Sequence, residues 1–169
     1  MRELGSNEVS DLANGKPEDR AHLNVDVVRK QNQNILKKIE ELLALSYNLT
    51  YLEGVLYCDD FHEGKNSFDD LGETYGYINS FVRRDSGTNC FRFSYRRPLA
   101  GGKLIRQNIP MKAKGYTLAS FKRAAHDYEK ELALMTEEHY SRLRAQGKTT
   151  KEMARKLRAI KIFAHENDE

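Results

Sequence analysis

Three short segments with alternating side chains constrain the fold of this chain more than any other feature. They are YGYINSFVRR (75–84), NCFRFSYRR (89–97) and KLIRQNIPM (103–111), and the turn-forming sequences DSGTN and PLAGG separate them. A period of two and an enrichment in aromatic and β-branched residues are typical of β-strands. Because short turns join neighbouring strands in antiparallel order, the pattern predicts a three-stranded antiparallel meander.

The two faces of this predicted sheet differ in chemistry. Alternate residues of a strand point to opposite faces, so Phe91, Phe93 and Tyr95 share one face of the second strand. We expect one amphipathic helix, over about 117–133, to cover that face. The opposite face and the strand ends then carry a polar and basic set: Arg83, Arg84, Arg92, Ser94, Arg96, Arg97, Lys103, Arg106 and Asn108.

The charge of the chain is concentrated around these strands. Residues 77–125 hold 11 Lys and Arg but a single acid, Asp85, whereas residues 1–76 hold 8 basic and 15 acidic residues. Such an asymmetry points to a polyanionic partner. A β-ribbon fits the DNA major groove, where Arg pairs with guanine and Asn with adenine, and further Lys and Arg neutralise phosphates. We therefore expect the polar and basic set to bind double-stranded DNA.

A long amphipathic helix is predicted over residues 23–56. Apolar residues recur every seven positions at Val28, Ile35, Leu42 and Leu49, a helical spacing. A helix of about 30 residues is ~45 Å long, more than a small core covers. We expect this stripe to form a homodimer or to bind a protein partner, although packing within the chain remains open.

The remaining segments complete an α+β fold: a long N-terminal helix, a three-stranded antiparallel sheet packed on one helix, and a helical C-terminal segment. Few apolar residues predict a flexible tail over 1–22, and Gly54 followed by acidic residues predicts a linker over 57–74. Residues 75–135 form the DNA-binding domain in this interpretation. Residues 136–169 hold two helices, capped by Thr136 and by the pair Thr149 and Glu152, with Gly147 as a stop between them.

The order of elements resembles the AP2/ERF-type DNA-binding domain, which also occurs at the N-termini of integrases. The segments GYINSFVRR, FRFSYRR, GGKLIRQNIPM and SFKRAAHDY carry this resemblance, which covers about Tyr77 to Leu132. It implies that the sheet enters the major groove. Carried over by position, the reading residues are Asn79, Arg83, Arg92, Ser94, Arg96, Arg106 and Asn108. The chain has no tryptophan, unlike many plant members.

Three alternatives stay open. The strand 103–111 followed by two helices is also the order of a ribbon-helix-helix protein, which would place Arg106 and Asn108 in the groove. An uncovered aromatic face would instead suit RNA, because Tyr77, Phe81, Phe91, Phe93 and Tyr95 could stack on bases. The third alternative is a protein-interaction adaptor built on the long helix.

Several kinds of chemistry lack support in the sequence. Asp59, Asp60, His62 and Glu63 match no metal-ligand spacing, and Cys58 and Cys90 form no C-x-x-C pair. The segment before Lys148 lacks the first glycine of a phosphate-binding loop. We expect no enzyme activity, no cofactor and a cytoplasmic location, because the polar N-terminus is unlike a signal peptide. The prediction is a sequence-specific DNA-binding transcriptional regulator of a mobile element, such as a phage or plasmid.

Overall fold

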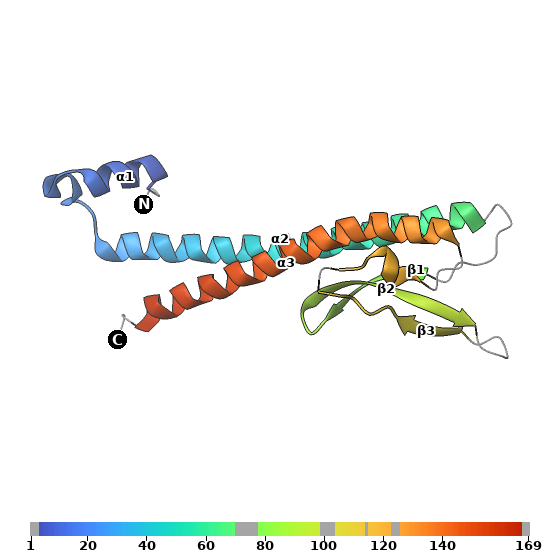
Figure 1. The fold of residues 1–169 in the computed structure, drawn as a ribbon. Coiled ribbons are helices and arrows are strands. Elements are labelled where there is room, and N and C mark those ends of the chain that lie inside the picture. The colour runs from blue at the N-terminus through green and yellow to red at the C-terminus, as the bar shows by residue number, and fades with distance from the viewer. Residues whose placement is uncertain (1–3, 70–77, 99–103, 114, 123–125, 167–169) are drawn as a thin grey trace. The chain divides into compact units, whose positions relative to one another are not determined.

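The computed structural model describes residues 4–69, 78–98, 104–113, 115–122 and 126–166 (Figure 1). Its elements are α1 (Ser6–Asn14), α2 (Val25–Asp69), β1 (Ile78–Asp85), β2 (Thr88–Pro98), β3 (Leu104–Asn108) and α3 (Asp127–Glu166), with 3-10 turns at Pro17–Arg20 and Leu118–Phe121. The α+β class with a long N-terminal helix, a three-stranded sheet and a helical C-terminal segment is confirmed. The chain divides into two compact units, Leu45–Met153 and Met1–Ala44 with Ala154–Glu169.

The sheet is the predicted antiparallel meander, in the order β1-β2-β3. Asp85 pairs with Thr88 across the first turn, and the two residues between them, Ser86 and Gly87, have φ values of 46° and 72°. Positive φ at both central positions is the geometry of a two-residue turn whose twist matches that of the flanking strands. The register that follows places Ser94 of β2 opposite Asn79 of β1 and Asn108 of β3.

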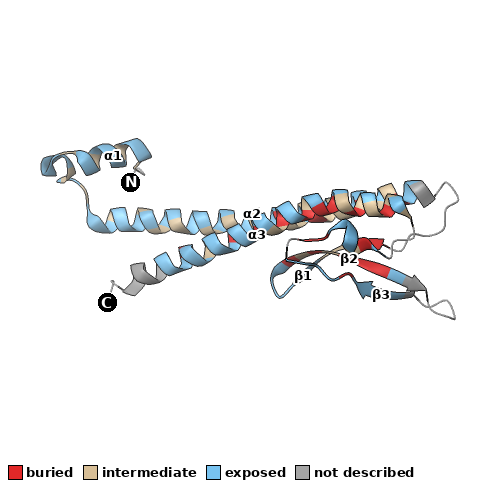
Figure 2. Cartoon of the chain, viewed as in Figure 1, coloured by how far each residue is buried: buried red, intermediate tan, exposed pale blue. Residues whose placement is uncertain are grey.

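The aromatic face of the sheet forms the core of the unit Leu45–Met153. Phe91 and Phe93 are 1% and 0% exposed, and the residues coloured as buried in Figure 2 lie mainly along β1 and β2 and where α2 and α3 meet the sheet. The Phe93 ring lies 6.0 Å from the Phe61 ring of α2 and 5.6 Å from the Tyr140 ring of α3, measured between centroids. Two helices therefore contact this face, where the sequence predicted one.

The two helices run antiparallel beside each other within this unit. The ring of Tyr57 on α2 stacks on that of His139 on α3 at 4.0 Å, and the Arg142 guanidinium donates to the Glu53 carboxylate. Tyr47, earlier on α2, approaches Gly147, later on α3. The sheet therefore packs on a pair of helices, of which α2 precedes the strands in the sequence and α3 follows them.

A buried ion pair holds the first strand to both helices. The Lys65 ammonium of α2 lies 3.7 Å from the Glu129 carboxylate of α3, and it donates to the Ile78 carbonyl at 2.9 Å. The Ile78 amide in turn donates to Glu129 at 3.0 Å. Because buried charges need partners and hydrogen bonds, this arrangement sets where β1 begins.

Helix α2 is longer than predicted. Residues 57–69, which we assigned to an acidic linker, continue the helix, and Gly54 lies inside it. Phe61 supplies the reason, since it is 2% exposed in the core and burying an aromatic side chain stabilises the helical turn that carries it. The rest of the linker, residues 70–74, lies outside the described residues.

Helix α3 also differs from the sequence prediction. The helix expected over 117–133 begins at Asp127, and the two C-terminal helices form one helix without a break at Gly147. The hydroxyls of Thr136 and Thr149 donate to the carbonyls four residues before them, Leu132 and Ala145. A threonine inside a helix makes this bond in place of an N-cap. The helix–helix break that a ribbon-helix-helix fold needs is therefore absent from the described part of α3.

The second unit contains α1 and the start of α2. Residues 6–14, which lie within the segment 1–22 that we expected to be a flexible tail, form a helix. Gln31 of α2 accepts from the Leu4 amide and donates to the Leu4 carbonyl. Arg20 donates to the Leu12 and Ala13 carbonyls at the end of α1, where cations are favourable. Polar contacts of this kind leave no periodic apolar signal in the sequence.

Candidate nucleic-acid interface

The face of the sheet opposite the core carries most of the predicted DNA-binding residues. Strand pairing and alternation place the following side chains on it: Asn79, Phe81 and Arg83 of β1, Cys90, Arg92, Ser94 and Arg96 of β2, and Arg106 and Asn108 of β3. We call this set the arginine face. Arg92, Ser94, Arg96, Arg106 and Asn108 lie on the face that the sequence predicted for them, because a period of two allows no other partition once the aromatic row is buried.

The four arginines of this face form its charged surface. Arg83, Arg96 and Arg106 are exposed and Arg92 is half-buried. The described residues of the three strands include one acidic side chain, Asp85. Its carboxylate lies 3.3 Å from the Arg83 guanidinium. The other three arginines belong to β2 and β3, and the described residues of those two strands include no acid.

A row of small polar side chains crosses the centre of the face. Asn79 and Ser94 are opposite each other and only 3% and 0% exposed, whereas Asn108, next in the row, is exposed. The Asn79 amide nitrogen and the Ser94 hydroxyl make no hydrogen bond in the described structure. Buried polar groups without partners are uncommon in proteins, which marks this row as a place where a ligand could supply the missing bonds.

Arg106 and Phe81 lie above this row. The guanidinium carbon of Arg106 is 5.5 Å from the centroid of the Phe81 ring. Arg106 belongs to β3 and Phe81 to β1, so the contact passes over Ser94 on the central strand. The pair thus contributes to the burial of a residue that we expected to be open. Phe81 itself was not predicted on this face, since we grouped it with the stacking aromatics.

Three predicted residues are not among the side chains that the described structure places on the arginine face. Arg84 lies on the core side, where its guanidinium donates to Asn48 and Asn89 and sits 4.6 Å from the centre of the Tyr51 ring. Arg97 pairs with Ile105 through the backbone, but its side chain lies outside the described residues, as does all of Lys103. Arg84 therefore anchors the β1–β2 turn to α2 in this structure.

Some rival interpretations depend on features that the structure does not have. RNA stacking on the sheet required an open aromatic face, but Phe91, Phe93 and Tyr95 are buried. The metal candidate at Asp59–Glu63 lies along α2, and no group of three or more His, Cys, Asp or Glu side chains in the described residues could hold a metal ion. His62 instead contacts the Ser80 carbonyl at 3.0 Å through Nε2.

The predicted dimerisation stripe is exposed along α2. Val28, Ile35, Leu42 and Leu49 are 42%, 45%, 64% and 54% exposed. Leu45, Leu52 and Leu56 are also more than half exposed, and they give the spacing 42, 45, 49, 52, 56. Alternating steps of three and four residues are the seam of a coiled coil. Val28 and Ile35, at the start of the stripe, line a pocket together with Leu4 and Val9 of the N-terminal segment, so the more exposed part of the stripe runs from Leu42 to Leu56. No described helix has both the length and the apolar composition to span a bilayer.

Part of the chain is similar to a known protein family. Residues 77–158 match the model of a family described as MobI protein, and this segment contains the whole sheet with most of α3. No curated protein and no solved structure matches the chain. The similarity is compatible with the mobile-element context predicted from the sequence, and it includes every residue of the arginine face.

Proposed function

We propose that this chain binds double-stranded DNA through the arginine face, in the service of a mobile element. The observation that carries the proposal is the grouping of Arg83, Arg92, Arg96 and Arg106 on one side of a sheet whose other side is buried. A cationic patch of this kind favours long-range attraction to a polyanion. A sheet backed by two helices also holds the four side chains in a fixed pattern.

The roles of the arginines follow from their positions. Arg106 and Asn108 are exposed on the same strand two residues apart, so both can point into one groove, Arg toward guanine and Asn toward adenine. Arg83 lies near the end of β1, close to the turn, and Arg96 lies toward the other end of the sheet on β2. Outlying cations of this kind suit the phosphates that flank a groove. A sheet docked in the major groove, as the AP2/ERF resemblance implies, uses both sets.

The buried polar row of Asn79 and Ser94 could add hydrogen bonds to DNA after the arginines have bound. When DNA phosphates or bases attract the Arg106 guanidinium away from Phe81, the Ser94 hydroxyl and the Asn79 amide lose part of their cover. Both groups lack partners in the described structure, so hydrogen bonds to base edges would compensate for exposing them. We propose that this row adds sequence preference once the arginines have docked.

Two uses of such DNA binding are compatible with these features. The similarity to MobI proteins over residues 77–158 favours a mobilisation-related role. Transcriptional regulation within a phage or plasmid is the second candidate, favoured by the exposed stripe of α2, because regulators commonly bind paired half-sites as dimers. Both uses require the same DNA-binding surface.

The test is duplex binding by fluorescence anisotropy at several salt concentrations. We expect Arg96→Ala and Arg106→Ala to weaken binding at least tenfold, and each to reduce the magnitude of the log–log salt slope by about 0.9 if it removes one phosphate contact. Arg155→Ala is the matched control, since Arg155 is an exposed arginine of α3 far in sequence from the sheet. No binding at low salt, or an equal loss in all three variants, would overturn the proposal.

A further inference from the structure

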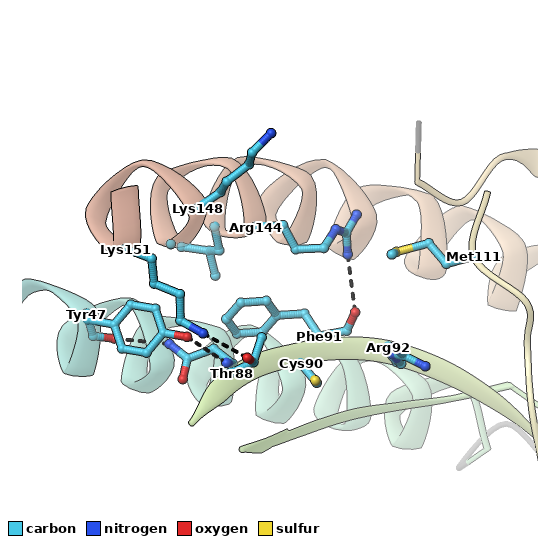
Figure 3. Close-up of a pocket in the computed structure, with 12 residues that line it drawn as sticks. Tyr47, Thr88, Cys90, Phe91, Arg92, Met111, Arg144, Lys148 and Lys151 are labelled. Atoms are coloured by element: carbon cyan, nitrogen blue, oxygen red, sulfur yellow. Dashed lines mark hydrogen bonds between the residues drawn. The ribbon is translucent and has the colours of Figure 1, made fainter. Parts of the chain in front are cut away.

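Side chains of α2 and α3 satisfy backbone groups at two edges of the sheet. At the outer edge of β1, the Ile78 amide donates to Glu129 and the Ile78 carbonyl accepts from Lys65. Beyond the end of β3, the Phe91 carbonyl of β2 accepts from Arg144 of α3 at 3.2 Å, a bond drawn in Figure 3. These edge positions therefore have partners within the chain.

The outer edge of β3 has no such partners among the described residues. The Ile109 amide donates to the Phe93 carbonyl at 3.0 Å, one step beyond the pair Ser94 and Asn108. Because bonded and non-bonded positions alternate in an antiparallel pair, the backbone groups of Arg106 and Asn108 point away from β2. No hydrogen bond between described residues reaches these groups, and residues 105–108 are exposed. Figure 1 shows β3 on the side of the sheet away from α2 and α3. Such an edge is a template for a further strand.

The same edge carries an exposed apolar side chain and a small pocket. Ile105, near the start of β3, is 47% exposed, and alternation places it on the side of Tyr95. A pocket of about 240 Å³ lies by the other end of β3, and its lining residues are Tyr95, Gln107, Asn108, Pro110, Ala119, Ser120 and Lys122. Pro110 and Ala119 are exposed there. This pocket can receive an aliphatic side chain from a strand that runs antiparallel to β3.

We propose that β3 pairs antiparallel with β3 of a second copy of this chain, about a twofold axis at Gln107. Arg106 then lies opposite the partner's Asn108, and the two residues exchange backbone hydrogen bonds. Ile105 lies opposite the partner's Ile109, beside the partner's pocket. A register centred on Arg106 would instead place two arginines opposite each other, which is destabilising. A register centred on Ile105 would leave both pockets unfilled.

The pairing joins the arginine faces of the two copies. Opposite residues of neighbouring strands point to the same face of a sheet, so both arginine faces lie on one side of the joined sheet. Arg106 and Asn108 of each copy lie at its centre, related by the twofold axis. A surface with this symmetry suits an inverted repeat in DNA. The pairing itself needs no DNA, since backbone groups and Ile105 supply its contacts.

A cysteine at position 107 tests the register. Opposite residues at a non-hydrogen-bonded position have Cα atoms about 4.5 Å apart, within the range of a disulfide. Gln107→Cys should therefore form a disulfide-linked dimer when treated with diamide, as seen by non-reducing electrophoresis. Ile105→Cys is the matched control, because it is exposed on the same face of the same strand but lies two positions from the axis. It should crosslink no more than the wild type, whose cysteines are Cys58 and Cys90.

The contribution of Ile105 is tested in the Gln107→Cys chain. Ile105→Lys places a charge on the edge, which opposes strand pairing, and it should lower the yield of crosslinked dimer about fivefold. Ile105→Val should keep the yield. Ile105 is half-exposed, so the circular dichroism spectra of both variants should match that of the parent.

Leu49→Glu, introduced into the same chain, separates this contact from dimerisation through α2, and crosslinking should persist in it. Three results would each overturn the pairing: equal crosslinking of Gln107→Cys and Ile105→Cys, crosslinking that Ile105→Lys leaves unchanged, or crosslinking that disappears with Leu49→Glu. Every measurement omits DNA, so such a failure leaves the proposed DNA binding standing.

Discussion

The Arg106 guanidinium and the Phe81 ring face each other across the full width of the sheet, 5.5 Å apart from guanidinium carbon to ring centroid. They belong to the outer strands β3 and β1, and Ser94 of the central strand lies between them without exposed surface. The contact keeps one arginine of the face folded onto the protein. Any ligand that uses Arg106 must compete with this cation–π interaction.

Replacing Phe81 by leucine should release Arg106. The variant keeps an apolar side chain over Ser94 but removes the aromatic face, worth ~0.5–1 kcal/mol at an exposed site. We expect duplex DNA to bind about two- to fivefold more tightly, measured by anisotropy at one salt concentration. Weaker binding by Phe81→Leu, at unchanged stability, would show that the ring itself contacts the DNA.

The exposed stripe of α2 predicts a homodimer. A glutamate at Leu49 would place a charge in the seam, so Leu49→Glu should shift the chain from dimer to monomer in sedimentation equilibrium. Ala44→Glu adds the same charge at an exposed position of α2 outside the stripe and should remain dimeric. A wild-type chain that is monomeric at tens of micromolar would contradict the prediction and leave the stripe to a different protein.

The pair Lys65 and Glu129 should show strong coupling in a double-mutant cycle. Lys65→Met leaves the Glu129 carboxylate buried beside one fewer cation, which typically lowers the free energy of unfolding by about 3–5 kcal/mol. Adding Glu129→Gln should recover part of this loss, since glutamine is neutral and can still accept from the Ile78 amide. Urea unfolding measures each step. Additive losses in the double variant would mean that the pair does not act as a unit.

Gly54 predicts an unusual response to alanine. A Cβ atom there would lie 2.0 Å from a ring carbon of Phe91, so Gly54→Ala should destabilise the protein by ~1–3 kcal/mol. Gly147→Ala is the control, because its Cβ would meet Tyr47 at 3.4 Å, an ordinary contact. There the better helix propensity of alanine, up to ~1 kcal/mol, should leave stability unchanged or raised. Equal effects in thermal unfolding would refute the packing argument.

These two glycines explain why the helices were harder to predict than the sheet. From sequence, Gly54 and Gly147 both look like helix ends, yet both lie inside helices at places of close packing. The reason is tertiary, since Phe91 and Tyr47 are distant in the chain. The faces of the strands, by contrast, follow from local alternation, and so the exposed positions of Arg83, Arg96 and Arg106 could be predicted. The burial of Ser94 could not, because it depends on a contact between two other strands.

His62 should make stability depend on pH. Burial lowers the pKa of this imidazole below its usual value, and the charges of Lys65 and Arg96 act in the same direction, while its bond to the Ser80 carbonyl and the charge of Asp59 oppose the shift. The unfolded chain, with a pKa near 6.5, then binds the proton more readily than the folded one. Stability is therefore full above about pH 6.5 and falls as the pH drops through that value toward the folded pKa.

Glutamine can replace His62 as a donor to Ser80 but does not titrate. Urea unfolding between pH 5 and pH 7.5 should show a shallower loss on acidification for His62→Gln than for the wild type. Identical pH profiles for the two proteins would place the acid sensitivity elsewhere.

The cover of the aromatic face is assembled from both ends of the chain, and this has a consequence during synthesis. The Ser80 hydroxyl bonds the Tyr140 hydroxyl at 2.6 Å across 60 residues, and Leu143 joins the same cluster. When a ribosome has released only the strands and α2, the aromatic row has one of its two covering helices. Exposed apolar surface of this kind promotes aggregation, so the nascent meander depends on the timely emergence of α3 or on a chaperone that shields it until then.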